Sequence, residues 1–204
     1  IQRNGLQLSG ASGDRVIEGL KATTDIAQAG CCELYVIATK ADGVAAAARS
    51  IAPLMSTGSM ILTIQNGMGA GERIAQHISK EHVLLGVADG FGASVTAPGK
   101  VHHAAMKLIR MGELGGGLSN RLESLVALWQ FAGFNAKAFA DINQLIWEKF
   151  LCNVTFSGSC AAFDCTLGEL MADEQRWAVA LACTREAYAE GVARKINFSF
   201  DDPI

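Results

Sequence analysis

A lysine, an asparagine and a serine follow one another at steps of four in the segment WEKFLCNVTFS. Residues four apart lie on the same face of an α-helix, so Lys149, Asn153 and Ser157 can point at one common site. A helical lysine is most often a surface residue whose stem covers apolar neighbours. Trp147 and Phe150 crowd the same turns, and an inward-facing Lys149 would be partly desolvated. Desolvation lowers the pKa of a lysine and makes its ammonium a better proton donor near neutral pH.

Two further polar groups follow apolar segments that are typical of buried strands. Lys40 ends VIATK, and Gln65 and Asn66 come directly before Gly67 and Gly69 in IQNGMG. Ligands bind at the carboxyl ends of strands in open parallel sheets, and a helix that starts after a glycine-rich turn presents free N–H groups to an anion. IQNGMG also fits an ordinary strand-to-helix turn, and the motif alone does not decide between these interpretations.

Several other candidates give weaker signals. The glycines at 115–117 lack the G-x-G-x-x-G spacing and fit a flexible connection better than a phosphate loop. His102 and His103 have no cysteine or acidic neighbour at metal spacing, so no metal site is predicted. Asp89 and Glu113 have no evident partner in the sequence. A nucleophilic serine in a G-x-S-x-G turn does not occur, which argues against an α/β-hydrolase.

Apolar segments rich in β-branched residues alternate with helical patterns in the first half of the chain. The expected elements are a strand at 33–40, a helix at 43–55, a strand at 59–66, a helix at 69–79 and a strand at 83–90. This alternation predicts right-handed βαβ units and a parallel sheet.

The pattern changes after residue 90. Residues 91–114 are typical of a β-ribbon or antiparallel strands that close the sheet, 118–133 of an amphipathic helix and 135–140 of a short extended segment. Helical sequence follows from Asp141, a good N-cap residue. We therefore expect an incomplete dinucleotide-binding, Rossmann-like domain at 1–140 and the first helices of an all-α domain at 141–204.

Composition limits the function classes. The chain has 204 residues, half of them hydrophobic, and a net charge of −3, which gives no reason to expect a nucleic acid or an anionic membrane as partner. Six cysteines occur without a CxxC pair, so we expect reduced thiols in a cytoplasmic protein. No apolar segment reaches the roughly 18 residues that span a bilayer.

Together these motifs resemble the ketopantoate reductase (2-dehydropantoate 2-reductase) family of two-domain, NADPH-dependent enzymes of coenzyme A biosynthesis. The resemblance runs in order through VIATKA, IQNGMGAGE, GKVHH, MGEL and ADINQLIWEKFLCN. IQNGMG followed downstream by W-x-K-x-x-x-N is fairly specific, whereas either motif alone is weak. The implied reaction is hydride transfer from NADPH to the keto carbon of a 2-keto acid.

The resemblance also implies roles for individual residues. The catalytic lysine of the family falls on Lys149 and its first substrate-holding asparagine on Asn153. The strand-end asparagine that orients substrate against the nicotinamide falls on Asn66. Lys40, Asn66 and Gly67 fall on the cofactor side. Lys149 would hydrogen-bond the ketone oxygen, stabilise the developing alkoxide and supply the proton.

Three departures from the family pattern affect these expectations. The G-x-G-x-x-G turn and the residues that select NADP would precede Ile1, so the first βα unit is expected to be missing. The family usually has an asparagine where this chain has Ser157, whose shorter hydroxyl leaves the identity of the accepted acid open. Later helices, with a carboxylate-binding serine and an acidic residue, would follow Ile204, so the helical domain is also expected to be partial.

Two other functions stay open on the sequence alone. The first is reduction of another branched or aromatic 2-keto acid. The second is a non-catalytic NADP-binding sensor, although a sensor has no need of a proton donor beside the nicotinamide. The apolar helices after Asp141 face either a second subunit of a homodimer or the later helices of the same chain.

Overall fold

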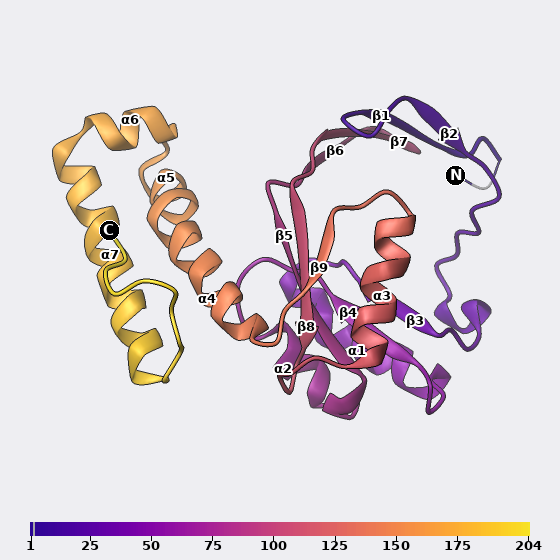
Figure 1. The fold of residues 1–204 in the computed structure, drawn as a ribbon. Helices are drawn as coiled ribbons and strands as arrows, with labels where there is room; N and C mark the ends of the chain where they lie inside the picture. Colours follow the sequence, from indigo (N-terminus) through magenta and orange to yellow (C-terminus); the bar gives the residue numbers. More distant parts are fainter. Residues whose placement is uncertain (2) are drawn as a thin grey trace.

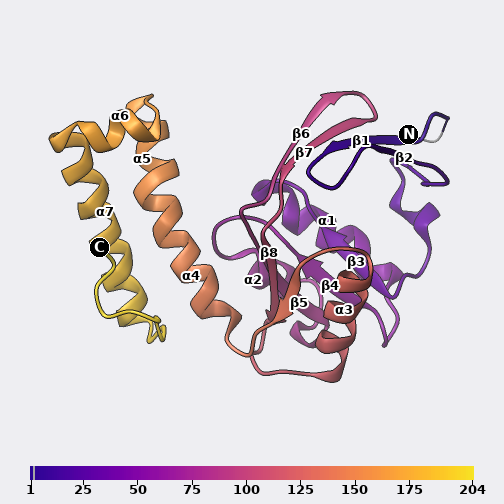
Figure 2. The same cartoon turned by 45° about the horizontal axis from the view of Figure 1, so that its top comes forward.

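The structure is a computed structural model that describes residues 1 and 3–204. Its strands form two sheets, and four α-helices form an arm that stands beside the larger sheet (Figures 1 and 2). A parallel-sheet unit followed by a helical unit is the predicted fold class, which is therefore confirmed. Within the described part of the chain, no helix is long and apolar enough to cross a membrane.

The larger sheet has five strands in the order β3-β4-β5-β8-β9. β3, β4 and β5 are parallel, β8 runs antiparallel to β5, and β9 is parallel to β8. The strand bounds are Leu34–Ile37 for β3, Met60–Thr63 for β4, Val83–Asp89 for β5, Leu108–Glu113 for β8 and Ala136–Ala138 for β9. The predicted parallel βαβ units are thus present, with strands shorter than the apolar segments that suggested them.

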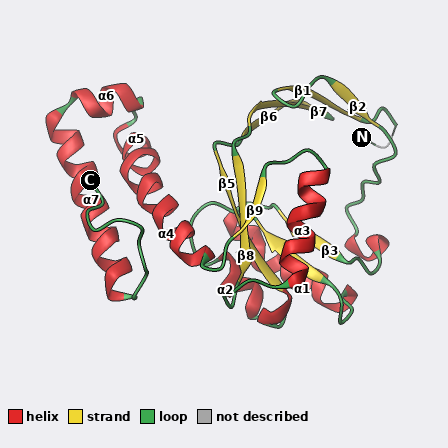
Figure 3. Ribbon diagram, viewed as in Figure 1, coloured by secondary structure: helices red, strands yellow, loops and turns green. Residues whose placement is uncertain are grey.

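Helices cover both faces of this sheet (Figure 3). α1 (Val44–Ile51) and α2 (Ala70–Ala75) pack through residues such as Ala48 and Ile74 on one face. α3 (Asn120–Phe131) packs on the other through Leu122, Leu125 and Val126. Short 3-10 helices connect these elements at Ile26–Ala29, Ala41–Gly43, Ala52–Leu54 and Lys80–His82.

The helix expected at 69–79 is shorter than predicted. α2 ends at Ala75 because the N–H groups of His77 and Ile78 both bond the carbonyl of Ile74, which tightens the chain into a turn. Ile78 is nevertheless buried in the core. The apolar spacing therefore indicated correctly that Ile78 is buried, but it overestimated the length of α2.

Part of the segment at 91–114 closes the larger sheet as expected, because β8 joins that sheet antiparallel to β5. The β-ribbon that precedes β8 does not join the larger sheet, which corrects the expectation for that part of the segment. β6 (Gly92–Ala97) and β7 (Lys100–Ala105) leave it and form a second sheet with β1 (Leu6–Gly10) and β2 (Arg15–Ile17), in the order β2-β1-β7-β6. β1 runs parallel to β7, about 90 residues later in the chain. Most residues of this sheet are partly or fully exposed, so no apolar pattern in the sequence indicates how its strands pair.

The helical arm contains α4 (Ile142–Cys152), α5 (Ser159–Phe163), α6 (Leu167–Ala172) and α7 (Glu174–Ala193). Asp141 caps α4 as predicted, because its carboxylate accepts the N–H of Gln144 at 3.1 Å. Between α4 and α5 the backbone is π-helical over Asn153–Gly158, where the sequence analysis expected an uninterrupted α-helix. There the buried hydroxyls of Thr155 and Thr184 lie 2.6 Å apart and join this segment to α7.

Gly112 on β8 allows the start of α4 to approach the sheet. A Cβ atom at Gly112 would lie 2.4 Å from the Cβ atom of Ile142, far inside van der Waals contact. Ile142 is fully buried and belongs to the same core as β3, β4 and β5. This contact therefore holds the arm against the sheet.

We predict that Gly112→Ala lowers the free energy of unfolding by about 1–3 kcal/mol, because the new methyl group must displace α4 from the sheet. Gly115→Ala is the matched control, since a Cβ atom there meets nothing within 4 Å. Urea titration measures both variants. Equal stability of the two variants would contradict the proposed contact.

Glu113, at the end of β8, joins the sheet to α3. Its carboxylate accepts hydrogen bonds from Ser119, the N-cap of α3, and from Nε of Arg121 at 2.9 Å. Burial raises the pKa of Glu113, but the bonds from Arg121 and Ser119 outweigh it and hold that pKa below its usual value. Glu113 therefore has two side-chain partners, although none was evident from the sequence.

We predict that Arg121→Met lowers the free energy of unfolding by about 1–2 kcal/mol at neutral pH, because Glu113 loses a charged partner. A depressed carboxyl pKa stabilises the fold above the unfolded-state value of about 4.3 and ceases to do so as the pH falls through the folded value. The difference from the parent protein should shrink on acidification. Denaturant titrations at several pH values measure this difference, with the exposed Arg185→Met as control. A difference that is independent of pH would contradict the assignment of the effect to the ionised Glu113.

Candidate active site

Lys149 lies on the side of α4 that faces the sheet. Its ammonium donates a hydrogen bond to the carbonyl of Ala88, at the carboxyl end of β5, and the side chain is half-buried. Burial is the largest influence on its pKa and lowers it below the usual value, and the Arg110 guanidinium lowers it further. Asp89 and Cys152 oppose this decrease. Lys149 is therefore an inward-facing, partly desolvated amine.

Lys149 borders a cavity of about 750 Å³ between the end of β5 and the helical arm. Its polar lining residues include Asp89, Lys107, Arg110, Glu148 and Asn153. Its apolar lining residues are Leu151, Phe156, Trp177, Leu181, Phe200, Pro203 and Ile204. The cavity thus combines charged groups, the lysine among them, with apolar side chains that suit a hydrocarbon group.

An ion pair borders the same cavity close to Lys149. Nε of Arg110 on β8 is 2.9 Å from Oδ2 of Asp89 on β5. The antiparallel register places Arg110 opposite Val87, so Asp89 is its diagonal neighbour on the same face of the sheet. The partner of Asp89 could not be predicted, because the register of these two strands is not readable from the sequence.

Asn153 and Ser157 are placed differently from each other. Asn153 is partly buried and borders the cavity one turn after Lys149. Ser157 is exposed and is not among the residues that line this cavity, whereas Thr155 and Phe156 are. A π-helix pairs residues five apart, so the expected ladder at steps of four does not continue past Asn153.

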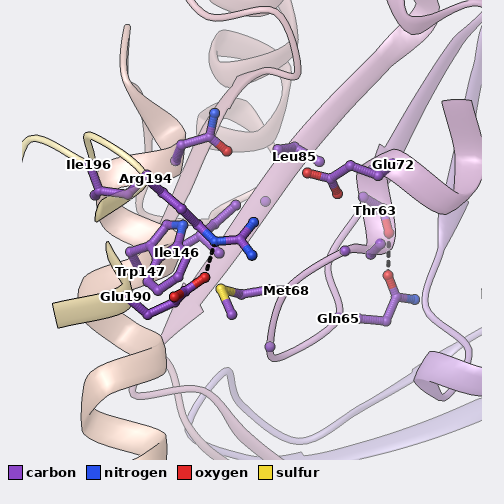
Figure 4. A pocket seen from close by; sticks show the side chains of 16 residues that line it. Thr63, Gln65, Met68, Glu72, Leu85, Ile146, Trp147, Glu190, Arg194 and Ile196 are labelled. Atoms are coloured by element: carbon purple, nitrogen blue, oxygen red, sulfur yellow. Dashed lines mark hydrogen bonds and ion pairs between the residues drawn. The ribbon is translucent and has the colours of Figure 1, made fainter. Parts of the chain in front are cut away.

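A second cavity, of about 710 Å³, also borders α4 (Figure 4). Ile146 and Trp147 of α4 border it together with Glu190, Arg194 and Ile196, and Figure 4 shows this group facing the loop after β4. The sheet side contributes Thr63, Gln65, Gly67, Met68, Gly69, Ala70, Gly71, Glu72, Leu85 and Gly86. α4 therefore borders both cavities, and both reach β5.

The turn IQNGMG follows β4 as predicted. Gly67 and Gly69 have φ angles of 85° and 86°, which only glycine adopts without strain, and Gly69 directly precedes α2. The amide nitrogen of Gln65 donates to the carbonyls of Ile37 and Thr39, at 2.9 and 3.0 Å. The side chain of Gln65 therefore holds the carboxyl ends of β3 and β4 together by hydrogen bonds.

Lys40 and Asn66 lie at the carboxyl ends of β3 and β4 and are exposed. Neither is among the residues that border the two cavities described above. The structure therefore brings Lys149 and Asn153 together in one cavity, places Gly67 at the other, and leaves Lys40 and Asn66 on the adjoining surface.

Comparison with known proteins agrees with this architecture. A family model described as ketopantoate reductase PanE/ApbA matches residues 1–116, and a model of the C-terminal part of the same family matches residues 141–204. The 2-dehydropantoate 2-reductase of Halobacterium salinarum is 29% identical over 171 residues, which cover 84% of this chain and 56% of that protein. The enzyme of the same name from Mesorhizobium japonicum is 29% identical over 218 residues, covering 97% of this chain and 66% of that protein. The chain thus spans somewhat over half of the length of these relatives.

Solved structures show the same fold. The crystal structure of 2-dehydropantoate 2-reductase from Geobacter metallireducens has a TM-score of 0.90 at 27% identity, covering 99% of this chain and 67% of that chain. A D-mandelate dehydrogenase, solved with NADH and anilino(oxo)acetate, has a TM-score of 0.82 at 20% identity, covering 98% and 64%. The second similarity shows the fold alone. With both family models matching, this chain belongs to the ketopantoate reductase family of oxidoreductases.

Proposed function

We propose that the protein containing this chain is an NADPH-dependent reductase of 2-keto acids that converts 2-dehydropantoate (ketopantoate) to (R)-pantoate, in pantothenate and coenzyme A biosynthesis. The observation that carries the proposal is the position of Lys149, whose ammonium lies at the carboxyl end of β5 inside a cavity. That edge of a parallel sheet is where α/β enzymes bind dinucleotides and substrates. Family membership and the names of the relatives support the same activity.

The residues present fit the nicotinamide side of a dinucleotide. Gly67 has open space around the position of a Cβ atom, at the border of the 710 Å³ cavity and the carboxyl end of β4. Lys40 and Asn66, exposed on the adjoining strand ends, would contact the cofactor from there. When bound, the cofactor supplies the hydride. The glycine-rich turn that holds a pyrophosphate is not among these residues.

Lys149 would act as the proton donor. An ammonium has three N–H donors, and the carbonyl of Ala88 accepts one of them. The remaining donors can hydrogen-bond the substrate ketone, stabilise the alkoxide that develops there and deliver the proton. The bond to Ala88 orients the amine, because it fixes an otherwise flexible side chain toward the cavity.

Asn153 would hold a hydroxyl or carbonyl of the substrate, since it borders the same cavity. Asn66 would orient the substrate against the nicotinamide. Ser157 would contact the substrate only from the open side of the cavity, because it is exposed. We further propose that the protein is cytoplasmic, in keeping with its six free cysteines.

The apolar side chains that border the 750 Å³ cavity favour a second candidate, the reduction of another branched or aromatic 2-keto acid. Phe156 and Trp177 stack there with ring centroids 6.2 Å apart. A hydrocarbon or aryl group would be buried against these rings. The hydroxymethyl group of ketopantoate gains less from such a surface.

Replacing Lys149 tests its role as proton donor. We expect Lys149→Met in the full-length protein to lower kcat at least about 100-fold, the lower limit of the usual range for general acid–base catalysis, with little change in NADPH affinity. Steady-state kinetics and fluorescence titration of NADPH measure these two quantities. Activity close to that of the parent protein would remove the basis of the proposed mechanism.

The pH dependence tests the electrostatic environment of Lys149. The ammonium is present below the pKa and lost as the pH rises through it, so activity should decline at a lower pH than an ordinary lysine would give. Because Asp89 raises the pKa of Lys149, Asp89→Asn should move the decline of kcat to still lower pH. The exposed Asp42→Asn serves as control and should leave the profile unchanged. A profile that Asp89→Asn does not alter would contradict this coupling.

Oxidation of NADPH, followed by its absorbance, identifies the substrate. Full-length protein is mixed with ketopantoate and with a panel of branched and aromatic 2-keto acids. We expect the highest kcat/KM with ketopantoate, and preference for an aromatic acid would select the second candidate. Tight NADPH binding with no turnover across the panel would instead identify a non-catalytic sensor.

A further inference from the structure

Cationic side chains outnumber carboxylates among the residues that border the 750 Å³ cavity. Lys107, Arg110 and Lys149 border it, against Asp89 and Glu148. The carboxylate of Glu148 is hydrogen-bonded within the protein, because its Oε1 accepts the N–H of Ser199 at 2.8 Å and the side-chain amide of Gln144 at 3.0 Å. A partly enclosed site with this charge balance attracts a small anion.

Arg110 is held in a defined position within this site. Its Nε faces Asp89 at 2.9 Å, and its guanidinium carbon lies 5.8 Å from the centre of the Phe139 ring. About 30% of the side chain is exposed. Among residues 1 and 3–204, no hydrogen bond engages its two terminal amino groups. Arg110 therefore has a fixed guanidinium with two free donor groups beside the cavity.

We propose that Arg110 is a further ligand of the carboxylate of the 2-keto acid, in addition to the serine that the family resemblance places after Ile204. Its two terminal amino groups would bind the carboxylate, while Lys149 bonds the adjacent ketone oxygen. The assignment rests on the proposed function. A guanidinium matches a carboxylate with two parallel N–H···O bonds, which a single ammonium cannot make. Arg110 and Lys149 come from β8 and α4 and border one cavity, as the neighbouring functional groups of a 2-keto acid require.

Asp89 holds Arg110 in position without occupying the terminal amino groups that would bind the substrate carboxylate. It approaches the Nε side, which leaves the opposite end of the guanidinium for an incoming carboxylate. The Phe139 ring supports the guanidinium plane. Asp89 and Phe139 are therefore positioning residues, and the arginine makes the contact with the substrate.

The chain offers a closely matched control. Arg176 also pairs with a carboxylate, that of Asp173 at 3.3 Å, and its guanidinium carbon lies 5.9 Å from the centre of the Phe163 ring. It is not among the residues that border the 750 Å³ cavity. Arg110→Met and Arg176→Met thus remove equivalent local contacts, and only the first removes the proposed carboxylate ligand.

Kinetics with an acid and its neutral ester test the assignment in the full-length protein. For the best 2-keto acid substrate, Arg110→Met should raise KM by about 10–100-fold, the usual effect of losing a hydrogen bond to a charged group. Arg110→Lys should give an intermediate KM. The KM of the methyl ester, the KM of NADPH and all constants of Arg176→Met should change less than about threefold. Equal changes for acid and ester would overturn the proposal.

A double variant separates binding by Arg110 from repulsion by Asp89. Arg110→Met leaves Asp89 unpaired, and its negative charge would itself repel the substrate. In Asp89→Asn/Arg110→Met both charges are absent, and KM of the acid should stay high if Arg110 binds the carboxylate. Return of KM to the parent value would show repulsion alone and overturn the proposal.

Binding of oxamate, a 2-keto acid analogue that is not reduced, tests the subsite without turnover. Calorimetry should show binding to the parent protein and to Arg176→Met, and at least about tenfold weaker binding to Arg110→Met. Absent binding to the parent protein, or equal binding to all three, would overturn the carboxylate subsite. A parent protein that binds oxamate through Arg110 but oxidises no NADPH would instead contradict the proposed function alone.

Discussion

The contact of α4 with the carboxyl end of the sheet is the constraint on which the site depends. The absence of a side chain at Gly112 lets Ile142 enter the core, and Lys149, two turns later, reaches the carbonyl of Ala88. The first contact fixes the position of the helix and the second fixes the direction of the amine. Because α4 borders both cavities, a shift of this helix would alter both at once.

The charges around Lys149 serve two opposing requirements. Burial weakens the hold of the amine on its proton, which favours donation, but a lysine that is mostly neutral could not act as an acid. Arg110 adds to the effect of burial, whereas Asp89 opposes it. Because Asp89 and Arg110 are paired, their opposite effects on Lys149 partly cancel, and the guanidinium is available at the same time as an anion ligand. One ion pair would thus connect the proposed proton donation with the proposed recognition of an acid.

The helical arm contributes apolar side chains that border the 750 Å³ cavity. It also departs from a regular α-helix directly after α4. The π-helical segment Asn153–Gly158 turns Thr155 and Phe156 toward the cavity, and Thr155 bonds Thr184 of α7. π-helical turns are often found at functional sites, because an inserted residue re-aims the neighbouring side chains. Here the segment begins at Asn153, directly after the helix that presents Lys149.

The sequence by itself determined the alternation of strands and helices, the cap at Asp141 and the inward face of α4, because these depend on local apolar spacing and on neighbouring residues. It also supplied the motifs that place the chain in its family. Only the tertiary structure decided that β7 pairs with β1, that Asp89 meets Arg110, and that Asn153 but not Ser157 borders the cavity. These outcomes depend on strand register between distant segments and on a change of helical period, and neither leaves a periodic signal in the sequence.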